Sequence, residues 1–278
     1  MHRKKLHALF GLKWNPFTPD QPTDAFWVTP PIESFCARVD AMIHDGGFAL
    51  VTGEVGTGKS VVLRVLAARL GELPEVCVGT LTRPQSGLAD FYRELGDLFG
   101  VELRPHNRWA GFKALRERWH AHAEASRLRP VLLVDEAQEM TPPVLSELRF
   151  LASAPFDAES YLTVVLAGDV RLPEKFRHPD LLPLGSRIRT RLVLDYASRE
   201  DLEHVLDNAL KNAGAPELMA ESVRAALVEH AGGNYRVMMT AAGELLLAAA
   251  EQGCSEIDDK LYVQLFDKRS TTRHRRRT

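Results

Sequence analysis

Short apolar runs alternate with helical patterns over the first two thirds of the chain. Each run is followed by a stretch in which apolar residues recur every three or four positions. The runs lie at 48–53, 76–81, 131–134, 162–168 and 190–196, and the helical patterns lie at 32–44, 59–71, 86–99, 108–126 and 142–153. Buried strands that alternate with amphipathic helices are typical of a parallel sheet. We therefore predict an α/β core in which helices flank a parallel sheet.

The pattern changes near residue 197. Beyond it the sequence shows only helical periodicity, at 199–213, 217–231, 234–252 and 257–267. This change predicts an α/β core over 31–197 and a small helical domain over 198–267. The first 30 residues are rich in proline and aromatic side chains, and we expect them to form an extended segment that packs on the core. Residues 268–278 form a basic tail.

A glycine-rich loop separates the first strand from its helix. The stretch GEVGTGKS, from Gly53 to Ser60, fits the pattern G-x-x-x-x-G-K-[ST]. Its glycines let backbone N–H groups converge on an anion, at the positive end of the helix dipole. In such a loop the lysine, Lys59, reaches the β- and γ-phosphates, and the serine hydroxyl binds Mg²⁺. The residues predicted to bind nucleotide are Gly53, Glu54, Val55, Gly56, Thr57, Gly58, Lys59, Ser60 and Val61.

Two carboxylates follow the apolar run at 131–134. A strand of this kind ends in Asp135 and Glu136, and unpaired buried charge is costly unless a ligand uses it. Ligands of open α/β sheets bind at the carboxyl ends of the strands. We expect Asp135 to hold Mg²⁺ together with Ser60, and Glu136 to activate the attacking water. ATP and Mg²⁺ are the predicted cofactors and ATP hydrolysis is the predicted reaction, with a metabolic P-loop kinase as an alternative.

A glutamate directly after the metal-binding aspartate resembles the AAA+ ATPases. The resemblance implies a polar residue at the end of the strand at 162–168, a position called sensor 1, and Asp169 stands there. AAA+ proteins usually carry Asn, Thr, Ser or Gln at this position, so an acid departs from the pattern. A second carboxylate beside Glu136 would repel it and raise one pKa, which implies slow hydrolysis.

The resemblance also implies two catalytic arginines. Arg187 in LGSRIRTRL matches the arginine finger that one AAA+ subunit presents to its neighbour's γ-phosphate, with Arg189 and Arg191 as alternatives. Such a finger implies a homo-oligomer. Arg236 in GGNYRVM matches sensor 2, where Asn234 suits the helix N-cap. Each arginine has the simpler interpretation of an ordinary surface or ion-pair charge.

Four stretches resemble one AAA+ group in particular. They are FGLKWNPF, GGFALVTGEVGTGKS, LVDEAQEM and VVLAGDVRLPEKFR. This group contains the ExeA-type secretion-associated ATPases and the transposition regulators of the TnsC, TniB, MuB and IstB kind. The regulators imply a ring or helical filament on duplex DNA that recruits and stimulates a transposase. ExeA-type proteins continue into a membrane span and a further domain, so a chain that ends in a basic tail favours the transposition branch. An ATPase of secretion or membrane-linked assembly is the alternative.

In this group the segment after the second strand contacts DNA. The predicted phosphate contacts are sequence-independent, and they are Arg83, Arg104, Arg108, Lys113 and Arg116. Four aromatic or aliphatic residues on one face of the helix at 108–126 are expected to belong to the core: Trp109, Phe112, Leu115 and Trp119.

Charge distribution, cysteine spacing and the length of the apolar runs add three constraints. The formal net charge is −2, but ten of the 35 basic residues lie in 1–13 and 268–278, which have no acid, so the rest of the chain is strongly acidic. Basic ends of this kind bind nucleic acid or an acidic partner, or merely aid solubility. Three cysteines without CxxC spacing predict neither a disulfide framework nor a zinc site. We find no secretory signal and no apolar run long enough for a membrane span, and we therefore expect a cytoplasmic protein without a membrane partner.

Overall fold

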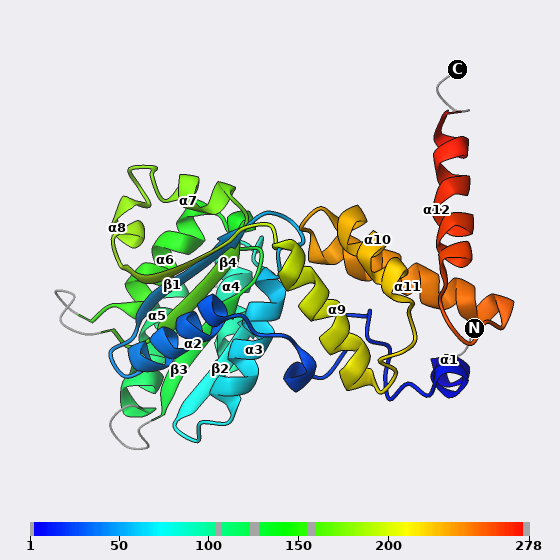
Figure 1. Ribbon diagram of the computed structural model, residues 1–278. Helices are drawn as coiled ribbons and strands as arrows, with labels where there is room; N and C mark the ends of the chain where they lie inside the picture. The colour runs from blue at the N-terminus through cyan, green and yellow to red at the C-terminus, as the bar shows by residue number, and fades with distance from the viewer. Residues whose placement is uncertain (1–2, 104–106, 123–127, 155–159, 275–278) are drawn as a thin grey trace. The chain divides into compact units, whose positions relative to one another are not determined.

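The computed structural model describes residues 3–103, 107–122, 128–154 and 160–274, and its chain divides into two compact units (Figure 1). The α/β unit comprises Val28–Val55 and Lys59–Asp195. The helical unit comprises the residues up to Trp27, those from Tyr196 onward, and Gly56–Gly58 of the glycine-rich loop. Each unit has its own hydrophobic core and is described separately.

A five-stranded parallel sheet is the centre of the α/β unit. Its strands are β1 (Gly47–Gly53), β2 (Val76–Leu81), β3 (Arg129–Val134), β4 (Thr163–Gly168) and β5 (Ile188–Leu194), in the order β2-β3-β4-β1-β5. Thr52 pairs with Gly168, and Val134 pairs with Leu166. The carboxyl ends of β1, β3 and β4 therefore meet at one edge of the sheet, which is where the sequence places the loop and the acidic residues.

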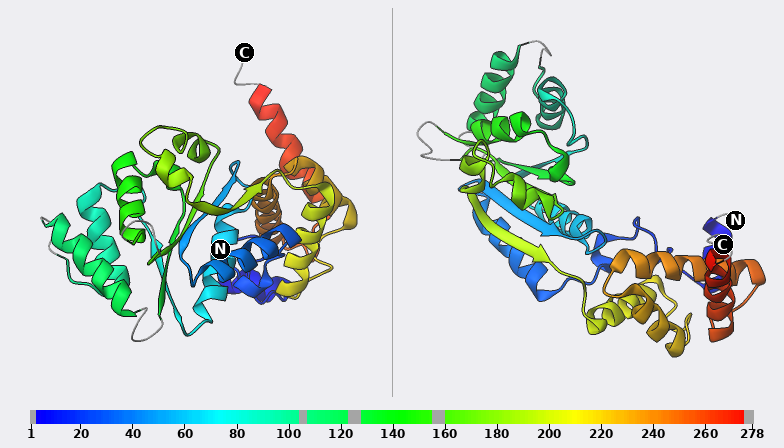
Figure 2. Two further views of the ribbon diagram at one scale, coloured as in Figure 1. Left: turned by 90° about the vertical axis from the view of Figure 1, so that its left-hand side faces the viewer. Right: turned by 90° about the horizontal axis from the view of Figure 1, so that it is seen from above.

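Helices cover both faces of this sheet (Figures 1 and 2). On one face lie α2 (Pro30–Met42) and α3 (Lys59–Gly71); on the other lie α4 (Leu88–Phe99), α5 (Arg108–Ala121) and α6 (Pro142–Ala152). Successive strand residues point to opposite faces, so Leu132 packs with α4, α5 and α6 while Leu133 packs with α2 and α3. Because both faces are buried, the central strands read as continuous apolar runs rather than as alternating ones.

The helical unit is built mainly from α9 (Arg199–Ala213), α10 (Glu221–Ala231), α11 (Tyr235–Gln252) and α12 (Asp259–His274). Ser198 and Asp201 form a reciprocal capping box at the start of α9, and Gly214 ends this helix in a left-handed conformation. Buried leucines at helical spacing, such as Leu206 and Leu210, form the core with residues of α10 and α11.

The N-terminal segment belongs to the helical unit, although we expected it to pack on the α/β core. It contains α1 (Arg3–Phe10) and the short helix η1 (Thr23–Ala25). Leu6, Leu12 and Phe17 are buried in the core of the helical unit, and Asn208 of α9 donates a hydrogen bond of 2.7 Å to the Ala25 carbonyl. A small bundle of four helices gains from these extra apolar side chains, because its own core is limited in size.

Three elements, α3, β2 and α9, have the bounds that the sequence predicts. The boundary between the two units lies between Asp195 and Tyr196, where the sequence predicts a change near residue 197. The prediction missed α1, η1, η3 (Ala137–Glu139), α7 (Arg171–Lys175) and α8 (Leu182–Gly185). Most of these helices have five residues or fewer, too few to show a helical period.

The predicted core face of α5 is wrong at one residue. Leu115 and Trp119 are fully buried, and Trp119 packs edge-on against Phe99 of α4. Trp109 in the first turn is 74% exposed, and it stacks on the half-buried ring of Phe112. The buried face of the helix therefore does not extend to its first turn, which helical periodicity alone cannot reveal.

The two tryptophans of α5 provide a matched test of this packing. We expect Trp119→Ala to lower the free energy of unfolding by about 3–5 kcal/mol, because it leaves a cavity between α4 and α5. Trp109→Ala should lower it by less than about 1 kcal/mol, because the ring is mostly in solvent. Urea unfolding followed by circular dichroism measures both, and equal losses would contradict the assignment of the two faces.

Candidate functional site

The glycine-rich loop joins β1 to α3 at the carboxyl edge of the sheet. Gly56 and Gly58 have φ values of 85° and 101°, a region that residues with a Cβ rarely adopt, so the loop needs glycine at both positions. Lys59, the first residue of α3, is 93% buried. Its ammonium group donates hydrogen bonds to the carbonyls of Gly53 at 3.0 Å and Glu54 at 2.9 Å. The Lys59 side chain is thus held within the loop that is predicted to bind the phosphates.

A hydrogen bond joins the start of α3 to the end of β3. The Ser60 hydroxyl donates to Oδ2 of Asp135 at 2.6 Å, and Oδ1 of Asp135 accepts from the backbone N–H of Glu136 at 2.9 Å. A serine hydroxyl and a carboxylate are the hard oxygen donors that Mg²⁺ prefers, and Mg²⁺ sites usually combine one or two such ligands with phosphates and waters. The two side chains therefore fit the predicted magnesium site.

Glu136 has an unusual backbone conformation. Its φ of 51° and ψ of 37° are left-handed, and it is the sole non-glycine residue with a positive φ in the described part of the chain. This conformation costs about 1–2 kcal/mol in a residue with a Cβ. The Glu136 carboxylate accepts a hydrogen bond from the side-chain amide of Gln138. Backbone strain of this kind gathers at functional sites, and here it coincides with the predicted water-activating residue.

The Asp169 carboxylate is paired with Arg171. Arg171 donates to its carboxylate from Nε at 2.8 Å and from its backbone N–H at 2.9 Å. The Arg171 guanidinium holds the pKa of Asp169 below its usual value. Arg171 also bonds Glu139 at 2.9 Å. The carboxylate repulsion that we expected between Asp169 and Glu136 is therefore offset by a cation that the sequence prediction missed.

The sequence analysis also did not identify Gln138, whose side chain is bonded to both Glu136 and Asp169. Its Nε2 donates to Glu136, and its Oε1 accepts from the backbone N–H of Asp169 at 3.1 Å. A polar residue two positions after Glu136, in LVDEAQEM, is a sequence signal that could have identified it, because a tight turn after the strand returns that side chain to the sheet edge.

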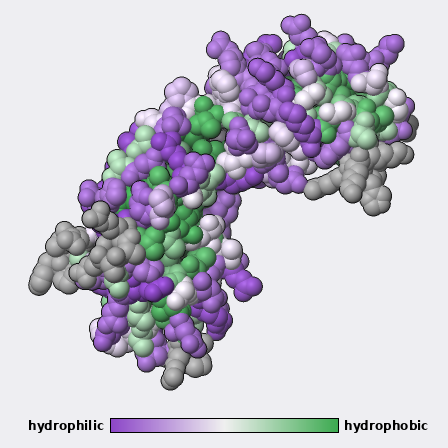
Figure 3. Space-filling model, turned by 90° about the horizontal axis from the view of Figure 1, so that it is seen from below, coloured by the Kyte–Doolittle hydropathy of each residue, from purple (hydrophilic) through white to green (hydrophobic). Residues whose placement is uncertain are grey.

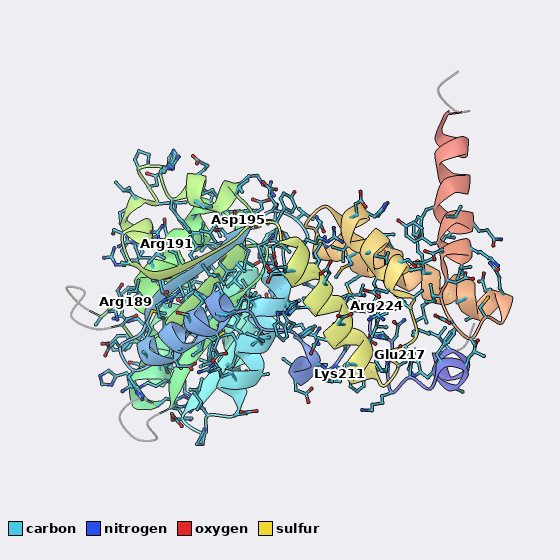
Figure 4. All side chains as sticks on the ribbon, in the orientation of Figure 1. Arg189, Arg191, Asp195, Lys211, Glu217 and Arg224 are labelled. Carbon is cyan, nitrogen blue, oxygen red and sulfur yellow. The ribbon has the colours of Figure 1, made fainter. Side chains whose placement is uncertain are left out.

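The three candidate finger residues lie in or just before the edge strand β5. Arg187 is half-buried, and its guanidinium donates to the Pro183 carbonyl. Arg189 and Arg191 project from β5 (Figure 4), and both lie on its exposed face. Arg189 lies 3.9 Å from the Asp45 carboxylate.

Arg236 lies in the helical unit, in the first turn of α11, and is exposed. Asn234 caps this helix as predicted, because its side-chain oxygen accepts from the Val237 N–H at 3.2 Å.

The residues that are predicted to contact DNA differ in their exposure and in the partners that their charged groups have within the chain. Arg83, in the loop after β2, and Lys113 of α5 are exposed, and Lys113 makes a 3.6 Å ion pair with Glu117. Arg116 lies over the rings of Phe112 and Tyr161, about 5.1 Å from each ring centre. Arg104 lies outside the described residues.

Arg108 has a structural partner. It donates a hydrogen bond of 3.0 Å and a second, shorter one to the carboxylate of Glu147, which is 96% buried. The Tyr92 hydroxyl donates to the same carboxylate, and burial together with the Glu147 charge raises the pKa of Tyr92. A buried carboxylate is tolerated only when it is paired, so Arg108 balances Glu147 between α5 and α6.

The face drawn in Figure 3 is mostly hydrophilic, and hydrophobic residues also gather on it. Large exposed side chains of this kind in the α/β unit include Trp109, Phe150 and Val193. In the described part of the chain no helix is long and apolar enough to cross a membrane. Cys36, Cys77 and Cys254 are all free thiols, and burial raises the pKa of Cys36 to about 11.

Part of this chain matches a protein family, and most of it is similar to a known protein. Residues 42–176 match the family described as AAA domain. The chain is 32% identical over 255 residues to the general secretion pathway protein A of Aeromonas hydrophila, and the match covers 89% of this chain and 45% of that protein. This chain thus spans less than half the length of that relative.

Solved structures share the fold at low sequence identity. Cdc6p from Pyrobaculum aerophilum superposes with a TM-score of 0.69 at 17% identity, over 87% of this chain and 67% of that one. The ORC2 protein of Aeropyrum pernix gives 0.68 at 16% identity, over 89% and 69%. The Drosophila ORC structure gives 0.64 at 20% identity, over 94% and 64%. Residues 42–176 thus match an AAA domain, and the chain has the P-loop fold of the AAA+ ATPases.

Proposed function

We propose that this chain is a Mg²⁺-dependent ATPase that works as a homo-oligomer, a ring or helical filament, on duplex DNA. The observation that carries the ATPase proposal is the 2.6 Å bond between Ser60 and Asp135, next to Lys59 and Glu136. It brings the two predicted metal ligands together from sequence positions 75 residues apart. An AAA domain with this fold implies nucleotide binding and hydrolysis.

Each side chain of the site has a distinct role in this proposal. The loop N–H groups and Lys59 bind the phosphates, while Ser60 and Asp135 hold Mg²⁺, which supplies charge neutralisation on the phosphates. Glu136 accepts a proton from the attacking water. The Asp169 carboxylate is bonded by Arg171, so in this proposal Asp169 does not act as a second base. Its backbone N–H instead donates to Gln138, the residue that bonds Glu136.

The arginines at the edge of the sheet support the proposed oligomer. Arg187 is the proposed finger, with Arg189 and Arg191 as alternatives, and Arg236 is the proposed sensor 2 residue. Arg189 and Arg191 are exposed on β5, an edge strand that no other strand of the described sheet covers. An arginine supplied by a neighbouring subunit stabilises charge in the transition state, so hydrolysis would depend on assembly.

Duplex DNA is the proposed ligand of the assembly. Arg83 and Lys113 carry this part of the proposal, because their charges are exposed and phosphate contacts need only reachable cations. Two solved structures with a similar fold, the Drosophila ORC and the Aeropyrum pernix ORC1 protein, are described as bound to DNA. A transposase is the proposed protein partner, and this step rests on the sequence resemblance to transposition regulators. The three free thiols suit a reducing cytoplasm.

A second candidate function is an ATPase of protein secretion or membrane-linked assembly. The 32% identity to the general secretion pathway protein A, over most of this chain, favours it. Both candidates share the ATP site and differ in the partner, so the DNA-binding experiment below separates them.

Replacing Lys59 tests the phosphate site. Lys59→Ala should abolish ATP binding and nucleotide-dependent assembly together, because it removes the cation that reaches the phosphates. Binding of a fluorescent ATP analogue and analytical ultracentrifugation measure the two effects. The matched control is Lys211→Ala, which removes an exposed lysine from α9 of the helical unit. ATP binding at unchanged affinity in Lys59→Ala would contradict the assigned site.

Mixing two inactive variants tests the arginine finger. Glu136→Gln keeps the finger but lacks the base, and Arg187→Ala keeps the base but lacks the finger. Each alone should lose about a thousandfold in turnover. A mixture should regain activity, because a mixed interface combines one variant's Arg187 with the other's Glu136. Failure of the mixture to regain turnover while each variant still assembles would exclude Arg187 and move the test to Arg189 and Arg191.

Charge removal tests the DNA interface. The double variant Arg83→Ala, Lys113→Ala should weaken ATP-dependent binding to duplex DNA and lower the slope of log affinity against log salt by about 2. The control pair, Arg177→Ala with Lys211→Ala, removes two exposed charges elsewhere. Fluorescence anisotropy at several salt concentrations gives the slopes. If the wild-type chain ignores DNA in every nucleotide state, the secretion or assembly function is favoured.

A further inference from the structure

We propose that Gln138 is the positioning residue of the hydrolytic site: its amide orients the Glu136 carboxylate and ties it to the end of β4. The inference rests on the proposed ATPase function, in which Glu136 is the base. It assigns a role to a residue that the motifs of the ATP site do not include.

The side-chain amide of Gln138 forms a hydrogen bond at its nitrogen and another at its oxygen. Nε2 of Gln138 donates to Oε2 of Glu136, and Oε1 of Gln138 accepts from the Asp169 N–H at 3.1 Å. The two bonds fix the amide orientation, because a flipped amide would set its oxygen against a carboxylate and its NH₂ group against an N–H. Gln138 thus links the acid that follows β3 to the backbone that follows β4.

The surroundings hold this amide in place. Gln138 is 96% buried, and a Cβ added at Gly168 would lie 2.6 Å from its Oε1, so this close approach needs glycine. Lys175 of α7 donates to the carbonyls of Gln138 and Met140, the latter at 2.8 Å. The turn is therefore fixed at the backbone as well as at the side chain, and the amide has little freedom to move independently of the sheet.

The geometry also explains why an acid is tolerated at the end of β4. The Asp169 side chain is held by Arg171, which keeps the pKa of Asp169 low and its charge paired. The Asp169 backbone N–H is linked to Glu136 through the Gln138 amide. Because Gln138 occupies Oε2, it fixes the direction of Oε1, the oxygen that would accept the proton from water.

Two substitutions separate positioning from folding. Gln138→Leu is similar in size and removes both bonds. Gln138→Glu keeps an acceptor for the Asp169 N–H but replaces the donor to Glu136 with a like charge. For both variants at neutral pH we expect kcat to fall at least about tenfold, since a misplacement of about 1 Å can cost about a hundredfold in rate. ATP affinity should stay within about twofold, because Lys59 and Ser60 are untouched.

The pH profile of Gln138→Glu provides a readout that a purely structural role would not give. The charged groups around this position are Glu136, Glu139, Asp169, Arg171 and Lys175. Two adjacent carboxylates share a proton as the pH falls, and the protonated side chain at 138 can then donate to Glu136 as the amide does. The ratio of kcat in this variant to wild-type kcat should therefore rise about tenfold between about pH 8 and pH 5.5.

The control for added charge is Gln252→Glu, at the exposed end of α11, where the ratio should stay flat. Wild-type turnover with an inactive Glu136→Gln variant establishes the ATPase function itself, and its failure would remove the proposed function rather than the role of Gln138. If that function holds, unchanged or increased kcat in Gln138→Leu, or no recovery of Gln138→Glu at low pH, would overturn the positioning role.

Discussion

The hydrogen bond between Ser60 and Asp135 is the constraint on which the site depends. It joins the first turn of α3, which follows β1, to the residue that follows β3, and in the sheet β4 lies between these two strands. The bond requires that β1 and β3 end at the same level, which the parallel register through β4 provides. A slip of one residue in either pairing would turn the strand side chains to the opposite face and separate the two oxygens.

Three carboxylates gather at this edge, and each has its own donor. Asp135 accepts from Ser60, Glu136 accepts from Gln138, and Asp169 is bonded by Arg171. Unpaired carboxylates would be costly at the end of a buried sheet and would repel one another. The distinct partners explain how the site keeps three acids close together and leaves each free for a different proposed role, as metal ligand, base or structural anchor. They also explain how an acid, Asp169, is accommodated at a position where an uncharged polar residue was expected.

Local sequence was a good guide wherever the determinants are local. The spacing from Gly53 to Ser60 and the acids after 131–134 predicted which residues meet at the sheet edge, because strand–loop–helix geometry fixes them over short distances. Contacts between distant elements were not predictable. Nothing near Arg108 in the sequence indicates its bonds to Glu147 on α6, so its charge looked available for DNA.

The same limit explains the other differences. The burial of Phe17 in the helical unit and the exposure of Trp109 depend on where partner helices begin and end rather than on the periodicity of the segment itself. Arg171 and Gln138 lie in the short helices α7 and η3, which are too short to show a helical period, and the fold brings their side chains to the acids.

If Ser60 and Asp135 hold the Mg²⁺ of an ATP site, replacing either residue should remove most of the effect of the ion on nucleotide binding. A double-mutant cycle with Ser60→Ala and Asp135→Asn, read out as the gain in ATP affinity on adding Mg²⁺, measures this effect. We expect each single variant to lose most of that gain and the double variant to lose little more, because both residues would hold one ion. A gain that persists in both single variants would rule out this magnesium site.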